Sequence, residues 1–172
     1  MTMNILKTEQ KRFLSLLEIV RREGELLLKT DARLFKANLN AAWVERLEND
    51  EDLAERLDAF VSRFGRMQDT LGDKLIPSLL RSLAEKPGSV LDNLNRAEKL
   101  GLLTSVVEWL DVRNLRNKLV HEYMADAEEF AIALNQAHVA VTLLVANYNT
   151  INLFAHSRIS APVWPNLLPV SN

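Results

Sequence analysis

The stretch RNLRNKLVHEY, residues 113–123, gathers side chains that could act together on a phosphate. It contains Arg116, Asn117, His121 and Tyr123, and His121 is one of three histidines in the chain. Histidine can exchange a proton near neutral pH, because its ordinary pKa is about 6.5. Arginine stays protonated and can hold a phosphate through two parallel hydrogen bonds. These groups would suffice for RNA cleavage without a metal, in which the 2′-hydroxyl is itself the nucleophile.

A helical wheel at about 100° per residue makes residues 105–123 an amphipathic helix with one residue out of place. The apolar arc holds Trp109, Val112, Leu115, Leu119, Val120 and Tyr123. The polar arc holds Asp111, Asn114, Asn117, Lys118, His121 and Glu122. Arg116 lies inside the apolar arc, where an unpaired guanidinium is expensive to bury. It must therefore reach an acid, carbonyl oxygens, a groove open to water or a bound anion.

The spacing of the polar residues favours a site shared between two chains. Arg116 and His121 are five residues apart and point about 140° from each other on an ideal helix. Asn117 and His121 are four apart and do face each other. A site that uses all three needs a wrapped ligand, a distorted helix or a second chain. Two such helices meeting across a two-fold axis would bring two arginines and two histidines into one cleft, so we expect a homodimer.

The composition limits the remaining possibilities. The chain has 172 residues, which predicts one domain with a substantial core. A net charge of −2 gives no overall basic footprint, and the absence of cysteine excludes disulfides and thiolate chemistry. No metal-binding or phosphate-loop motif is present, so we expect no metal and no cofactor. The first residues do not resemble a signal peptide, and no apolar run approaches the roughly 20 residues of a membrane span. A cytoplasmic location without membrane contact is the simplest expectation.

Few glycines and prolines interrupt the chain before its last eleven residues, and apolar residues recur at three- and four-residue spacing. This pattern predicts an all-helical protein. We expect helices over 7–34, from 38 to a break at 48–52, from 53 through a kink near Pro77 to a stop at 85–89, and over 90–100, 105–123 and 127–154. The last three starts carry capping residues: Ser89 with Asp92, Ser105 with Glu108, and Asp126 with Glu129. Gly101 suits a left-handed helix end.

The chain divides into a bundle and a tail. Residues 1–156 are expected to form the helical bundle. Residues 157–172 contain Pro162, Pro165 and Pro169 and cannot be helical throughout. We expect an extended arm that packs on the bundle through its apolar residues, which are Trp164, Leu167 and Leu168.

Residues 91–123, LDNLNRAEKLGLLTSVVEWLDVRNLRNKLVHEY, resemble the HEPN family, and most closely its HepT branch. Members carry an Arg, four intervening residues, a His, one further residue and a Tyr. Here these are Arg116, His121 and Tyr123, and Asn117 occupies the position after the Arg, which is commonly Asn. The run AEKLGLL followed by a capped helix matches the usual lead-in. The region 38–85 and the tail lie outside this resemblance.

The resemblance implies an up-and-down bundle of four to five helices that dimerises with its motif helices facing each other. Catalytic members are metal-independent ribonucleases and often toxins. Carried over, Arg116 would clamp the phosphate, His121 would transfer the proton and Asn117 would orient the reacting groups. In HepT-like pairs a nucleotidyltransferase antitoxin of the MntA type adenylylates the motif tyrosine, which corresponds to Tyr123.

Three functions remain open from the sequence. The chain could be such a ribonuclease toxin, with Arg113 and Lys118 as further substrate-binding residues. It could instead be a non-catalytic helical partner of a nucleotidyltransferase, binding its substrate or nucleotide. In the third, Arg116 only pairs with an acid such as Glu108 or Asp111 in a structural dimer, since a lone Arg and His on a helix are most often structural.

Overall fold

The computed structural model describes residues 2–121 and 126–170, and of His121 it describes the backbone only. Within these residues the protein is all-helical and contains no strand, which confirms the expected class of helical bundle. The α-helices are α1 (Thr2–Leu34), α2 (Ala41–Glu45), α3 (Glu51–Asp69), α4 (Ile76–Ser82), α5 (Val90–Lys99), α6 (Val106–His121) and α7 (Ala127–His156). A 3-10 turn, η1 (Arg46–Asn49), follows α2, and a π-helical segment, η2 (Thr70–Leu75), joins α3 to α4.

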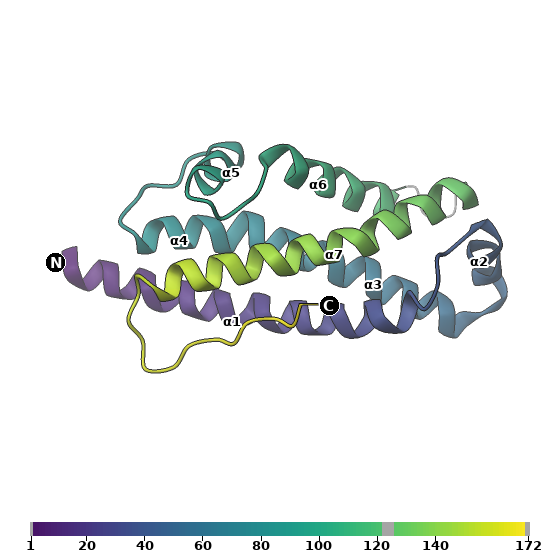
Figure 1. Ribbon diagram of the computed structural model, residues 1–172, viewed down its shortest axis with the longest axis horizontal. Helices are drawn as coiled ribbons and strands as arrows, with labels where there is room; N and C mark the ends of the chain where they lie inside the picture. Colours follow the sequence, from purple (N-terminus) through teal and green to yellow (C-terminus); the bar gives the residue numbers. More distant parts are fainter. Residues whose placement is uncertain (1, 122–125, 171–172) are drawn as a thin grey trace.

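The long helices lie side by side around one core (Figure 1). Helix α1 packs against α3, α4 and α7, and α6 packs against α7 and α3. The largest fully buried side chains come from α1, the α3–η2–α4 run and α7: Phe13, Leu17, Leu27, Leu57, Phe60, Phe64, Met67, Leu71, Leu75, Ile76, Leu79 and Tyr148. Burying each such side chain stabilises the fold by about 1.5–3 kcal/mol. Trp109 and Leu119 of α6 are also buried in this core, which therefore fixes the positions of α3 and α6, the helices that carry the candidate site.

The predicted helix ends are borne out by their hydrogen bonds. Ser89 and Asp92 form a reciprocal capping box at the start of α5. Asp126 accepts from two backbone N–H groups at the start of α7, and Asp50 accepts from the N–H of Leu53 at the start of α3, after the predicted break. Gly101 has φ +75°, the left-handed conformation expected of a helix end.

The disturbance predicted near Pro77 lies just before it, in the π-helical segment η2. Proline has no N–H to donate to the carbonyl four residues back, so a regular α-helical ladder cannot pass through it. Gly72 in η2 lies against the ring of Trp109 on α6, and a Cβ at Gly72 would be only 2.8 Å from Cζ2 of that ring. The π-helical segment and its glycine therefore bring α6 close to the α3–η2–α4 run.

Helix α7 corrects one sequence-based expectation. It is long enough and apolar enough on average to cross a membrane, although no such segment was expected. Half of its most apolar stretch is buried inside the protein, which is also typical of a core helix. The helix further buries Asn147, Asn149 and Asn152. Its apolar character is thus used in packing within the bundle.

Replacing Gly72 by Ala should lower the free energy of unfolding by about 1–3 kcal/mol, because the added methyl group would overlap the Trp109 ring. Helix propensity alone predicts the opposite sign. Urea denaturation of both proteins measures the difference. Lys74→Ala, an exposed position in the same segment, is the matched control and should change stability little. A Gly72→Ala protein as stable as the parent would contradict the close approach.

Candidate functional site

An open groove of about 880 Å³ lies between α6 and the α3–η2 segment. Its lining residues are Asp58, Val61, Ser62, Gly65, Arg66, Asp69, Thr70, Asp73, Lys74, Arg113, Arg116, Leu119 and Val120. Four of these side chains are basic and three are acidic, a formal excess of one positive charge. The groove therefore combines cations that can bind an anion with carboxylates that already neutralise part of that charge.

Arg116 lies at the floor of the groove and is held by three neighbours. Its Nη2 donates to Oδ2 of Asp69 at 3.1 Å, and its Nη1 donates to Oδ1 of Asn117 at 3.2 Å. Its Nε is buried and has no partner among the described residues. Gly65 makes room for the guanidinium, since a Cβ there would lie 3.1 Å from Nε. One-third of the Arg116 side chain remains exposed, so the guanidinium stays accessible from the groove.

The structure shows which acidic residue pairs with Arg116, the arginine on the apolar arc of α6. Arg116 faces Asp69 on α3 and an open groove, two of the environments that its wheel position required. Within one chain Arg116 pairs with Asp69 and not with Glu108 or Asp111, the acids named in the structural alternative, which are both exposed on α6. Arg116 points from α6 toward α3, so its carboxylate has to come from another helix.

Arg113 lies one helical turn before Arg116 and lines the same groove. Its Nη1 is 3.6 Å from Oδ1 of Asp73 in η2. Two arginines of α6 thus face two carboxylates across the groove. Ion pairs with this much exposure contribute only about 0–1 kcal/mol each. An incoming phosphate could therefore replace Asp69 or Asp73 at a modest cost in free energy.

Of the other predicted site residues, Asn117 and Lys118 are described and do not line the groove. Asn117 is exposed and contacts only the edge of the Arg116 guanidinium. Lys118 is exposed and does not line the groove. His121 is the last residue of α6, and its side chain lies outside the described part of the chain. Tyr123 also lies outside the described residues. The described geometry therefore places Arg116 and Arg113 together but does not test the complete motif.

Two basic residues that the sequence did not single out complete the groove. Arg66 on α3 and Lys74 on η2 both line it, in the region that the family resemblance did not cover. Arg66 and Lys74 recur with Asp69 and Asp73 at helical spacing, which indicates one charged helix face. The sequence does not indicate that this face packs against α6. Val120, assigned to the apolar arc, is instead about half exposed at the groove, because the apolar arc is wider than the surface that α7 and α3 cover.

Glu23 on α1 lies behind this groove and contacts one of its walls. Its Oε1 accepts from the hydroxyl of Thr70 at 3.1 Å, and its Oε2 is buried with no partner among the described residues. Burial raises the pKa of the Glu23 carboxyl, and the charges of Arg66 and Lys74 oppose that effect only in part. A carboxyl group whose pKa lies above its ordinary value is thus hydrogen-bonded to Thr70 in the groove wall.

The remaining histidines lie away from the groove. His138 Nδ1 is 2.7 Å from Oδ1 of Asp31, and its ring stacks on Phe35. Burial raises the pKa of Asp31, while the bond to His138 lowers it. His156 is exposed and stacks on Trp164. Across residues 2–121 and 126–170, no group of three or more His, Asp or Glu side chains could hold a metal ion.

Comparisons of the chain with protein-family models, curated proteins and solved structures find no match. Any assignment of function therefore depends on the residues of this chain and their geometry.

Replacing Glu23 by Gln should stabilise the protein at pH 7–8 by on the order of 1 kcal/mol, because it removes a carboxylate that burial disfavours. A raised pKa means that the folded state holds the proton more tightly than the unfolded state. The stability from that proton is complete below the ordinary value of 4.5 and is lost as the pH rises through the raised value. The advantage of the Gln variant should therefore disappear in acid.

Urea denaturation at several pH values measures this difference. Glu55→Gln, at an exposed position of α3, is the control and should show no such dependence. A Glu23→Gln protein that is less stable than the parent at pH 8 would show that the carboxylate is favourably paired.

Proposed function

We propose that the chain is a HepT-like ribonuclease that cleaves RNA without a metal, in a cleft completed by a second copy of the chain. The observation that carries the proposal is the position of Arg116. The arginine of the motif lies at the floor of an open groove, beside Arg66, Lys74 and Arg113. The Arg116 guanidinium is one-third exposed at this groove, and it and three neighbouring cations are the kind of groups that bind a phosphodiester.

In the proposed reaction, Arg116 exchanges its bond to Asp69 for bonds to a phosphate oxygen of the scissile group. His121 takes the proton of the 2′-hydroxyl, and the 2′-oxygen attacks the phosphorus while the bond to the 5′-oxygen breaks. The leaving oxygen is protonated by the corresponding histidine of the second copy, which gives a cyclic phosphate and a free 5′-hydroxyl. Arg116 stabilises the extra negative charge of the transition state.

The other predicted residues have supporting roles in this proposal. Asn117 fixes the orientation of Arg116, to which it is already hydrogen-bonded. Arg113 and Lys118 bind neighbouring phosphates, and Tyr123 is the site at which a nucleotidyltransferase antitoxin of the MntA type would attach a nucleotide. RNA, a second copy of the chain and that antitoxin are thus the proposed partners, in the cytoplasm.

A specific observation favours the alternative of a non-catalytic, nucleotide-binding partner of a nucleotidyltransferase. Arg116 and Arg113 each already face a carboxylate, and the groove has only one positive charge in excess. Such a groove could bind the phosphates of one nucleotide without holding an RNA strand. The two functions differ in whether RNA is cut.

Arg116→Ala and His121→Ala should each reduce RNA cleavage by about 10²- to 10⁴-fold, because the first removes charge stabilisation and the second removes the proton-transfer group. Cleavage is measured with the purified protein in buffer containing a chelator. Arg33→Ala, an exposed arginine of α1 outside the groove, is the control and should keep full activity. A dimeric parent protein that leaves RNA intact under these conditions would contradict the ribonuclease and leave the alternative.

Arg66→Ala and Lys74→Ala should each lower the slope of log affinity against log salt by about 0.7 for single-stranded RNA, since each removes one phosphate contact. Filter binding to an RNA lacking the reactive 2′-hydroxyl separates this effect from cleavage. Arg33→Ala again supplies the baseline. Slopes that stay the same in both groove variants would show that RNA does not lie between α3 and α6.

A further inference from the structure

The C-terminal segment follows a long path over the bundle. After α7 ends at His156, the chain turns back and runs without regular structure along α7 and α1 as far as residue 170 (Figure 1). Residues 161–170 read APVWPNLLPV and contain three prolines and no charged side chain. The prolines restrict the backbone to extended conformations, so little entropy is lost when the segment binds.

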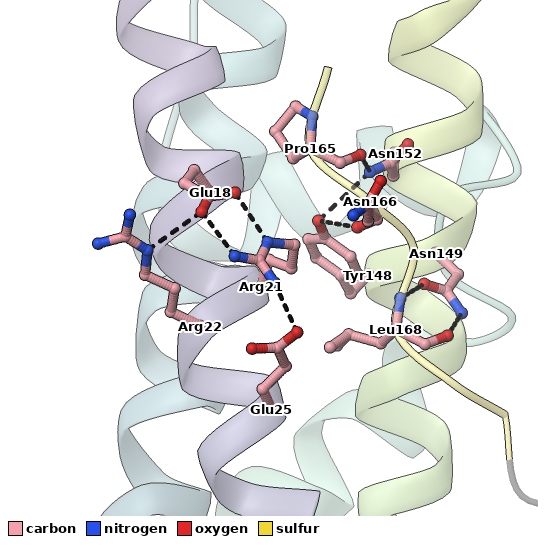
Figure 2. Close-up of polar contacts among 10 residues, drawn as sticks. All are labelled: Glu18, Arg21, Arg22, Glu25, Tyr148, Asn149, Asn152, Pro165, Asn166 and Leu168. Carbon is pink, nitrogen blue, oxygen red and sulfur yellow. Dashed lines mark hydrogen bonds and ion pairs between the residues drawn. The ribbon is translucent and has the colours of Figure 1, made fainter. Parts of the chain in front are cut away.

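Asn149 on α7 binds the backbone of the tail on both sides of one residue (Figure 2). Its Nδ2 donates to the carbonyl of Leu168 at 2.9 Å, and its Oδ1 accepts from the N–H of Leu168 at 2.8 Å. This pair of bonds imitates the pairing of two β-strands, with a side-chain amide in place of one backbone. Recognition of this kind satisfies an extended peptide whose own backbone groups would otherwise be buried without partners.

Tyr148, directly before Asn149, and Asn152, one turn after it, also bind the backbone of the tail (Figure 2). Asn152 Nδ2 donates to the carbonyl of Pro165 at 3.0 Å, and its Oδ1 accepts from the indole N–H of Trp164 at 2.9 Å. The hydroxyl of Tyr148 donates to the carbonyl of Asn166 at 3.0 Å. Burial raises the pKa of Tyr148 to about 12, so this donor persists at any physiological pH.

Two side chains of the tail, Leu168 and Trp164, pack closely against the bundle. Leu168 is 2% exposed and lies on Gly24 of α1, where a Cβ would be only 2.4 Å from its Cδ1. Trp164 stacks on the ring of His156 with 4.5 Å between centroids. Most of the residues between and beside these anchors are exposed, including Val163 and Leu167. The tail is thus held at a few points, Trp164 and Leu168 among them, on a surface of α1 and α7.

We propose that this face of α1 and α7 is a docking groove for an extended peptide of the pattern Trp-Pro-x-x-Leu, and that the same segment of a second copy binds there in exchange for the chain's own tail. Residues 161–170 then act as a ligand bound in cis. The second copy carries the same anchors, and only the higher effective concentration of the tethered tail favours the cis form. The inference does not depend on the proposed ribonuclease, because the candidate cleft lies between α3 and α6.

A labelled peptide of residues 161–172 tests the groove in the full chain. Leu168→Asp in the chain should release its tail, since burying a carboxylate at the apolar site against Gly24 is unfavourable. Fluorescence anisotropy should show the peptide binding this variant one to one and at least about tenfold more tightly than the parent, where the tail competes. The peptide carrying the same Leu168→Asp change should not bind, nor should the parent peptide bind a chain that combines Leu168→Asp with Gly24→Leu. Because the tail is uncharged, affinity should change little between about 50 and 200 mM salt, unlike that for RNA.

A Leu168→Asp chain that is folded by circular dichroism and does not bind the peptide would overturn the proposal. A variant that fails to fold would overturn it also, since the tail would then be part of the core.

A second measurement tests exchange of the tail between intact chains. The protein has no cysteine, so Ile19→Cys in one chain and Val163→Cys in another place single thiols on α1 and on the tail, at two positions that line the same pocket. Mixed chains should form a disulfide-linked dimer after incubation, and no such product would show that the tail stays in cis.

Discussion

The close contact of α6 with the α3–η2 run determines the shape of the candidate site. Gly65 lies under the guanidinium of Arg116, and Gly72 lies under the ring of Trp109. A side chain at Gly72 would overlap the Trp109 ring and move α6 outward, because the packed interior has no free volume to absorb it, and one at Gly65 would displace the Arg116 side chain. Two glycines seven residues apart therefore set the distance between the helices that form the groove.

This contact also explains why the groove is nearly neutral. Bringing two arginines of α6 close to another helix requires compensating charge, and Asp69 and Asp73 supply it. The carboxylates keep Arg116 and Arg113 extended into the groove when no ligand is bound. An anion that enters replaces contacts that are weak because they are exposed, so the arginines are oriented in advance.

On the face of α1 and α7 that binds the tail, neutral polar side chains make the hydrogen bonds, in contrast to the ion pairs of the groove. There, neutral amides and a hydroxyl of α7 satisfy the backbone of an uncharged segment. Amides can both donate and accept, so one side chain such as Asn149 can replace a strand edge. The charged groove and the face that holds the tail thus lie on different helix pairs, and the hydrogen bonds that hold the tail come from neutral side chains.

Much of the helical framework could be predicted from the sequence because its signals are local. The caps at Ser89 and Asp126 and the left-handed Gly101 depend only on hydrogen bonds within one or two turns. The break before Asp50 follows from the same chemistry. The average apolarity of α7 was underestimated, since its alanines, valines, leucines and isoleucines are interrupted by asparagines and other polar residues rather than forming one uninterrupted run.

The sequence by itself determined that Arg116 needs a partner, because a guanidinium on an apolar helix face has no other stable environment. Only the tertiary structure decided that the partner is Asp69, with Arg66 and Lys74 beside it. These residues are far apart in the chain, and their meeting depends on how α6 packs over Gly65. A charge pattern shows which side chains share a helix face, whereas packing of the core selects which two faces meet.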